Sequence, residues 1–181
     1  MQDLIEHCIS SQTIAEGGML TVKRDLVRLP NGNTSKREYV MHPGAVVVVP
    51  LQPNGNVILE KQFRYALHQV FIELPAGKID MGEDILVTGQ RELLEETGYS
   101  AADWVKLGHQ YPCIGYSNEI IHIFLAQGLT SGKHRRDDDE SLEVIEAPFE
   151  QCLSMIQNGE ITDGKTIVAL LLAEKYLSQH G

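Results

Sequence analysis

Residues 77–99 read GKIDMGEDILVTGQRELLEETGY, and this stretch decides the fold. It predicts a helix over residues 84–97, on which Glu92, Glu95 and Glu96 stand at positions i, i+3 and i+4 and share one face. The pattern predicts Gly89 on the same face, where it removes bulk. The apolar residues are expected on the opposite side, as a stripe that the fold buries: Leu86, Val87, Leu93 and Leu94.

Three carboxylates on one helical face predict a metal site. Mg²⁺ and similar hard cations take oxygen ligands from carboxylates, phosphates and water. The alternative is a solvated acidic face, but such a face usually carries Lys or Arg four residues from each Glu. Here Glu92 and Glu96 form a like-charge pair, which costs roughly 0.2–0.5 kcal/mol without a counter-ion. A bound cation would remove that cost.

The same stretch resembles the Nudix box, the signature of the Nudix hydrolase superfamily, at every specified position. The resemblance rests on these residues: Gly77, Glu83, Arg91, Glu92, Leu93, Glu95, Glu96, Gly98 and Tyr99. It implies hydrolysis, dependent on Mg²⁺ or else Mn²⁺, of a nucleoside diphosphate linked to another moiety. Its implied metal ligands are Glu92, Glu95, Glu96 and the backbone carbonyl of Ala76. Glu92 and Glu96 are also catalytic candidates, while Gly77, Glu83, Arg91 and Gly98 shape the motif.

The segments that flank the box resemble those of ADP-ribose pyrophosphatases and related nucleoside diphosphate sugar hydrolases. Upstream, KQFRY at 61–65 resembles a strand whose arginine, here Arg64, contacts substrate phosphate. Downstream, GYSNE at 115–119 resembles a loop whose glutamate, here Glu119, helps to arrange the site. Arg37 is a weaker candidate for substrate contact. One position departs from the subfamily: Ile114 stands where a proline is usual, which loosens the substrate assignment and leaves the chemistry intact.

The run of charged residues at 133–140 is expected to form a loop, which the resemblance connects with catalysis. In the subfamily an acidic residue on this loop acts as the general base or positions the water, and Glu140 is the first candidate here, with Asp138 second. A mobile loop can carry a base, because the base needs to reach its proton only when substrate is bound. The alternative is an exposed acidic loop that only keeps the protein soluble.

Composition limits the classes of protein to which the chain can belong. A length of 181 residues predicts one domain with a real core. The net charge of −10 argues against a nucleic-acid surface, which needs a basic face. The longest apolar run, residues 167–173, is too short to cross a bilayer, and no secretory signal is visible at the amino terminus. Three widely spaced cysteines suggest reduced thiols, so we expect a cytoplasmic protein without a membrane partner.

The order of elements predicts a mixed sheet between helices, and the Nudix resemblance makes this an α/β/α sandwich. We expect strands at 19–29, 35–41, 45–50, 57–65, 71–74, 104–111, 120–126 and 142–147, with further helices at 149–158 and 163–178. Residues 1–43 are expected to form a hairpin extension and residues 44–181 the hydrolase domain. A hairpin of this size must pack on something, and in the subfamily it forms a homodimer.

The sequence therefore predicts an enzyme that hydrolyses ADP-ribose or a similar nucleotide sugar to a nucleoside monophosphate and a sugar phosphate. Two alternatives stay open. One is a Nudix hydrolase of other nucleoside diphosphate derivatives, such as GDP-mannose, ADP-glucose or dinucleoside polyphosphates, or of nucleoside triphosphates. The other is a Nudix module that binds a nucleotide without hydrolysing it.

Overall fold

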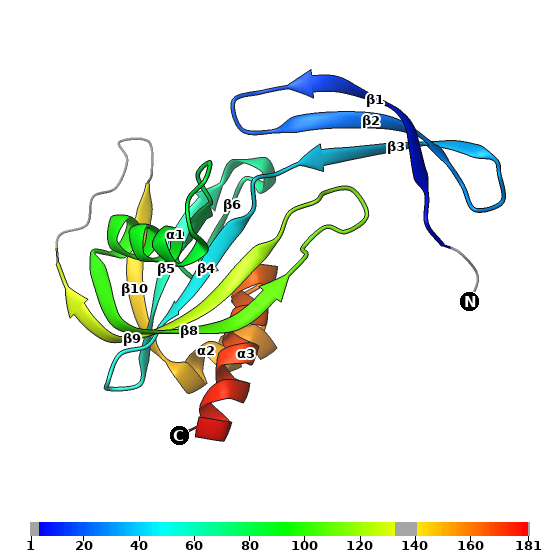
Figure 1. Cartoon of the computed structure of the whole chain (residues 1–181). Helices are drawn as coiled ribbons and strands as arrows, with labels where there is room; N and C mark the ends of the chain where they lie inside the picture. The colour runs from blue at the N-terminus through cyan, green and yellow to red at the C-terminus, as the bar shows by residue number, and fades with distance from the viewer. Residues whose placement is uncertain (1–3, 133–140, 181) are drawn as a thin grey trace. The chain divides into compact units, whose positions relative to one another are not determined.

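The computed structural model describes residues 4–132 and 141–180. The chain divides into two compact units, of which the first comprises Met1–Pro43 and Cys113–Glu119. The second comprises Gly44–Pro112 and Ile120–Gly181 and contains all the helices of the described residues (Figure 1).

The second unit is built on a four-stranded mixed sheet with the order β7-β4-β9-β8. Its strands are β7 (Ala76–Lys78), β4 (Ala45–Pro50), β9 (Ile121–Ser131) and β8 (Tyr99–Gln110). Strand β4 is parallel to β9 and antiparallel to β7. Every residue of β4 is buried, because helices cover both faces of the sheet, and this explains its continuous run of valines.

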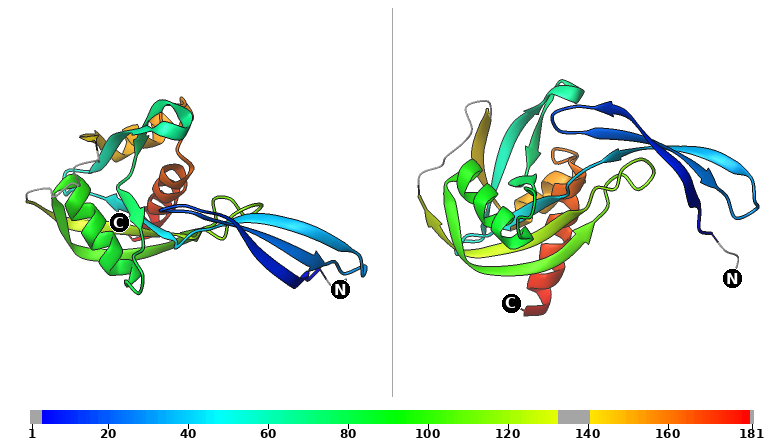
Figure 2. Two further views of the ribbon diagram at one scale, coloured as in Figure 1. Left: turned by 90° about the horizontal axis from the view of Figure 1, so that it is seen from above. Right: turned by 45° about the horizontal axis from the view of Figure 1, so that its top comes forward.

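Alternate residues of β4 belong to two separate apolar clusters. Val46 and Val48 pack with Leu93 on the face covered by α1 (Ile85–Glu92). Val47 and Val49 belong to the larger cluster on the other face, together with residues of α2 (Phe149–Gln157) and α3 (Gly164–His180). Figure 2 shows α1 and the α2–α3 pair on opposite sides of the sheet. This arrangement confirms the predicted α/β/α sandwich.

A second sheet in the same unit, with the order β10-β5-β6, is fully antiparallel. It contains β10 (Leu142–Pro148), β5 (Asn56–Arg64) and β6 (Gln69–Glu73). A short 3₁₀ turn, Tyr65–Leu67, connects β5 to β6. The sequence predicted all three strands but not that they form a sheet of their own, because a pattern of residues does not specify which strands pair.

The box helix differs from its prediction in three respects. It is α-helical from Ile85 to Glu92, and it then continues as a π-helical turn, Leu93–Thr97, which ends at Gly98 with φ = 78°. Val87 is 50% exposed, so the predicted apolar stripe was wrong at this position. Gly89 faces the sheet rather than the carboxylates, since a Cβ there would lie 3.2 Å from Val46.

The first unit is a three-stranded antiparallel sheet of β1 (His7–Glu16), β2 (Thr21–Arg28) and β3 (Thr34–Met41). The predicted hairpin corresponds to β2 and β3, whereas β1 was not predicted. Segment 113–119 joins this sheet through backbone hydrogen bonds between Val40 and its residues Tyr116 and Asn118. Among the described residues of this unit, Val27 is the only buried hydrophobic side chain. The sheet therefore has almost no core of its own.

The structure agrees with the expectation of reduced cysteines. Cys8, Cys113 and Cys152 are free thiols. Within the ranges 4–132 and 141–180, no helix has the length and apolar character that a membrane crossing requires.

Leu93→Ala should destabilise the protein by about 2–5 kcal/mol, because Leu93 is fully buried between α1 and the sheet. Val87→Ala, on the exposed side of the same helix, is the matched control and should change the free energy of unfolding by less than about 0.5 kcal/mol. Denaturant unfolding measures both. Similar losses for the two variants would contradict this packing.

Candidate active site

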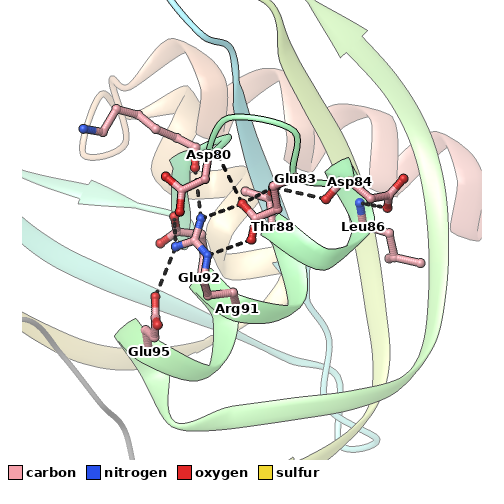
Figure 3. Close-up of polar contacts among 9 residues, drawn as sticks. Asp80, Glu83, Asp84, Leu86, Thr88, Arg91, Glu92 and Glu95 are labelled. Carbon is pink, nitrogen blue, oxygen red and sulfur yellow. Dashed lines mark hydrogen bonds and ion pairs between the residues drawn. The ribbon is translucent and has the colours of Figure 1, made fainter. Parts of the chain in front are cut away.

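Arg91 holds the loop before α1 against the helix. Its Nε and Nη2 atoms donate to the two carboxylate oxygens of Glu83, each at 3.0 Å, and Nη2 also donates to the Lys78 carbonyl at 3.0 Å (Figure 3). Its Nη1 atom donates to Glu92 at 2.7 Å and to Glu95 at 3.2 Å. One guanidinium therefore fixes three carboxylates, and the fork geometry of arginine suits this role.

Glu83 receives further donors from its own loop and helix. The Thr88 hydroxyl donates to it at 2.7 Å, and the backbone N–H of Asp80 donates at 3.3 Å. Hydrogen bonding from Arg91 lowers the pKa of Glu83 to about 2, so its carboxylate stays ionised at neutral pH. Asp84 caps the helix by accepting from the Leu86 N–H at 2.8 Å.

Glu96 turns away from Arg91 and into the protein. It is 4% exposed, and its carboxylate accepts a hydrogen bond from the backbone N–H of Ala76 at 3.0 Å. It is also hydrogen-bonded to Glu60, a residue of β5 that is 2% exposed. Burial raises the pKa of Glu96 far above its ordinary value, and the neighbouring Glu60 raises it further. Two buried carboxyls that are hydrogen-bonded to each other can hold a proton between them.

Glu60 was missed by the sequence analysis. Burial raises its pKa to about 7, and the charge of Glu73 adds to the rise. One carboxyl oxygen, Oε1, is buried and has no hydrogen-bond partner among the described residues. A Glu directly after the apolar run VIL at 57–59 was the available signal, because a charged residue that continues a buried strand requires a partner.

The three box glutamates do not converge as the sequence predicted. Glu92 and Glu95 are drawn to Arg91, whereas Glu96 is bound to Ala76 and Glu60. In the described part of the chain, no three Asp, Glu, His or Cys side chains are grouped as metal ligands. The physical reason is mutual repulsion, which each carboxylate relieves by turning to its nearest donor.

The residues present nevertheless fit a divalent cation. Gly77 lies directly against Glu92, and a Cβ at this position would overlap the Glu92 carboxylate. A glycine here thus lets the carboxylate approach the backbone of β7. Together with the orphaned oxygen of Glu60, the box supplies the oxygen-rich, negatively charged surroundings that Mg²⁺ prefers. Glu92, Glu95, Glu96 and the Ala76 carbonyl are the residues that would hold it.

Arg64, the predicted phosphate ligand, lies at the end of β5 in the same unit. Its guanidinium makes two hydrogen bonds to Glu73, at 2.7 and 2.6 Å, and its side chain remains 44% exposed. Hydrogen bonding to Glu73 raises the pKa of Arg64, and Glu96, when it is ionised, adds a smaller contribution. The structure therefore brings a cation to the neighbourhood of the buried carboxylates.

Four other predicted residues belong to the first unit or fall outside the described residues. Glu119 belongs to the first unit, where it lies 3.6 Å from His42 Nδ1, and Arg37 of that unit is paired with Glu6. Both candidates for the general base, Glu140 and Asp138, fall outside the described residues. Gly98, as expected for a motif-shaping glycine, ends the box helix in a left-handed conformation.

Comparison with protein families matches the model of the NUDIX domain to residues 41–169. The chain is 41% identical, over 94% of its length and 93% of the relative, to an ADP-ribose pyrophosphatase from Bacillus subtilis (strain 168). It is 38% identical to a methanol dehydrogenase activator from Bacillus methanolicus, over 91% of this chain and 90% of that one.

Among solved structures, the chain resembles one described as an ADP compounds hydrolase. The TM-score is 0.90 at 23% identity, and the match covers 100% of this chain and 99% of the other. At this identity, the likeness establishes the fold.

Gly77→Ala should destabilise the protein by about 1–3 kcal/mol, because the added Cβ would displace the Glu92 carboxylate, which is buried and held by Arg91 at 2.7 Å. Gly18→Ala is the control, since nothing lies within 4 Å of a Cβ at that position. Thermal and denaturant unfolding give the two values. If Gly77→Ala is as stable as Gly18→Ala, the close approach of Glu92 to β7 is wrong.

Proposed function

Because the chain belongs to the NUDIX family and is a hydrolase, we propose that it hydrolyses the pyrophosphate bond of ADP-ribose or a related nucleoside diphosphate sugar. The products would be a nucleoside monophosphate and a sugar phosphate, and the reaction would need Mg²⁺, with Mn²⁺ as a possible substitute. One observation carries the proposal. Glu96 of the box and Glu60 are buried and hydrogen-bonded to each other, and the partly exposed cation of Arg64 interacts electrostatically with both carboxyls.

Each residue of the site has a separate role in the proposed hydrolysis of a pyrophosphate. When bound, the cation would neutralise phosphate charge and activate the attacking water. Arg91 holds Glu92 and Glu95 in place, and Gly77 makes room for Glu92. The Glu60–Glu96 pair can accept or release a proton, because burial raises the pKa of both carboxyls. Arg64 would bind a substrate phosphate.

The remaining site residues are proposals from the family resemblance. Glu140, or else Asp138, would serve as the general base. Glu119 and Arg37 would contact the substrate. The cytoplasmic location is likewise a prediction from the sequence.

The substrate class is supported by the relative from Bacillus subtilis, which is named an ADP-ribose pyrophosphatase and matches nearly the whole of this chain. GDP-mannose, ADP-glucose and dinucleoside polyphosphates are the alternatives within the same chemistry, since the box does not read the base or the sugar. At Ile114 this chain departs from the subfamily pattern, in which a proline is usual.

A second candidate function comes from the other relative, which is named a methanol dehydrogenase activator. A protein of this kind would act on another enzyme, and it need not hydrolyse a nucleotide to do so. The complete set of box glutamates argues for hydrolysis. Hydrolysis of a nucleoside diphosphate sugar by the isolated protein would distinguish an enzyme from a protein that only activates another enzyme.

We also propose that the protein is a homodimer formed through the first unit. The sheet of this unit buries only Val27 among its described hydrophobic residues. Its apolar side chains are exposed, and burying them against a second copy would stabilise the sheet: Leu4, Ile5, Ile9, Ile14, Met19 and Met41.

Glu96→Gln should lower kcat by at least about 100-fold while leaving the fold intact, because the neutral amide cannot accept a proton or neutralise a cation. The assay offers a panel of nucleoside diphosphate sugars with Mg²⁺ or with EDTA, and product identification shows which bond is cut. Glu143→Gln, an exposed residue of β10, is the control. Full activity of Glu96→Gln, or no turnover of any substrate by the wild type, would refute the assignment.

Light scattering at micromolar concentration should give a dimer for the wild type. Ile9→Glu should shift it toward monomer, since Ile9 is exposed on β1 and a charge there opposes burial. Leu171→Glu, similarly exposed on α3 of the second unit, should leave the dimer unchanged. A monomeric wild type would rule out the homodimer.

A further inference from the structure

Glu73 is an almost fully buried carboxylate outside the box. It is the last residue of β6, and its side chain is 4% exposed. Three hydrogen bonds from two cationic side chains reach it: Arg64 donates twice, and Lys165 Nζ donates once to Oε2. Burial alone would raise the pKa of Glu73, but Arg64 and Lys165 outweigh it and the pKa is lowered. Glu73 is therefore an anion with fixed partners.

The amino-terminal end of α3 holds this carboxylate in place. Lys165, only 14% exposed, also pairs with Asp163 Oδ2 at 3.0 Å. Asp163 in turn accepts from the backbone N–H and the hydroxyl of Thr166, at 3.0 and 2.7 Å. The Leu74 N–H donates to the same hydroxyl at 2.9 Å, which links the helix to the residue after Glu73. Lys165 thus has little freedom to move.

The two hydrogen bonds that Arg64 donates to Glu73 use only one edge of its guanidinium. They engage Nε and Nη2, and Nη1 has no acceptor among the described residues. Because the guanidinium is planar, fixing one edge also fixes the direction of the other. The side chain remains 44% exposed, and no described acceptor occupies its free edge.

We propose that Glu73 and Lys165 are positioning residues for the reaction, which hold Arg64 so that its free edge meets a phosphate of the nucleoside diphosphate. The inference rests on the proposed function, which it deepens by assigning how the diphosphate is recognised. A pre-oriented arginine loses less side-chain entropy when substrate binds than a mobile one does. Neither Glu73 nor Lys165 needs to touch the substrate.

Stability alone is a weak reason for this network. Burying ion pairs costs desolvation, and apolar side chains of similar volume often stabilise a protein as well or better. Glu73 is also the cross-strand partner of Glu60, so β5 and β6 place a second buried carboxyl beside the first. Orienting the exposed cation of Arg64 is a function that explains why the protein keeps these buried charges in spite of their desolvation cost.

The test compares Glu73→Gln, Lys165→Met and Lys165→Arg with the wild type in steady-state hydrolysis of ADP-ribose. Glu73→Gln and Lys165→Met should raise KM about tenfold with kcat changed by no more than about threefold. Lys165→Arg keeps the charge and should recover most of the loss. Lys61→Met, which removes an exposed pair with Glu143 from the same strand as Arg64, should leave KM unchanged.

A double-mutant cycle distinguishes positioning from mere structural support. In an Arg64→Ala background, Glu73→Gln should raise KM no further, because the residue through which it acts is absent. Equal effects of Glu73→Gln in both backgrounds would overturn the inference. So would an unchanged KM in Glu73→Gln.

The Arg64 Nε–H signal in a ¹⁵N–¹H spectrum provides a readout that does not depend on turnover. In the wild type it should be shifted by the Glu73 carboxylate and slow to exchange, and in Glu73→Gln it should move and broaden. Assignment comes from its loss in Arg64→Lys. An unchanged signal in Glu73→Gln refutes the positioning inference, whereas a wild type that hydrolyses no nucleoside diphosphate sugar refutes the proposed function.

Discussion

Burial of negative charge is the constraint on which the site depends. Glu60, Glu73 and Glu96 are each at most 4% exposed, so water cannot neutralise them. The protein meets this constraint in two ways. Glu73 is ion-paired with Arg64 and Lys165, whereas Glu60 and Glu96 lie against each other and share a hydrogen bond. A pair of carboxyls that cannot both ionise holds a proton between them, and a bound cation would allow both to ionise.

The two sheets of the second unit bring these groups together. The central sheet supports the box, because Leu93 packs on Val46 and Val48 while Gly77 admits Glu92 to the edge of β7. The antiparallel sheet supplies Glu60, Arg64 and Glu73 from two adjacent strands. Packing of α3 across the core adds Lys165 to Glu73, 92 residues away in the sequence. The site therefore combines three separate parts of the chain: the box, the strands β5 and β6, and the start of α3.

Much of the fold could be predicted because its elements have strong local patterns. The buried strand at residues 45–50 and the two carboxy-terminal helices agree with prediction to within about two residues. Strand β1 was missed because all ten of its residues are exposed, so it lacks the alternation that indicates a half-buried strand. Gly89 was misplaced because helical spacing alone does not say which side faces the sheet.

The sequence by itself determined the box: its helix, its carboxylates and the family to which the chain belongs. These are local properties, since residues a few positions apart on a helix are neighbours in any fold. Only the tertiary structure decided the surroundings of those carboxylates. That Glu96 meets Glu60, and that Arg64 is fixed by Glu73 and Lys165, depends on strand pairing and helix packing between distant segments. Such contacts have no characteristic residue spacing in the sequence, because they form only when distant segments pack together in the core.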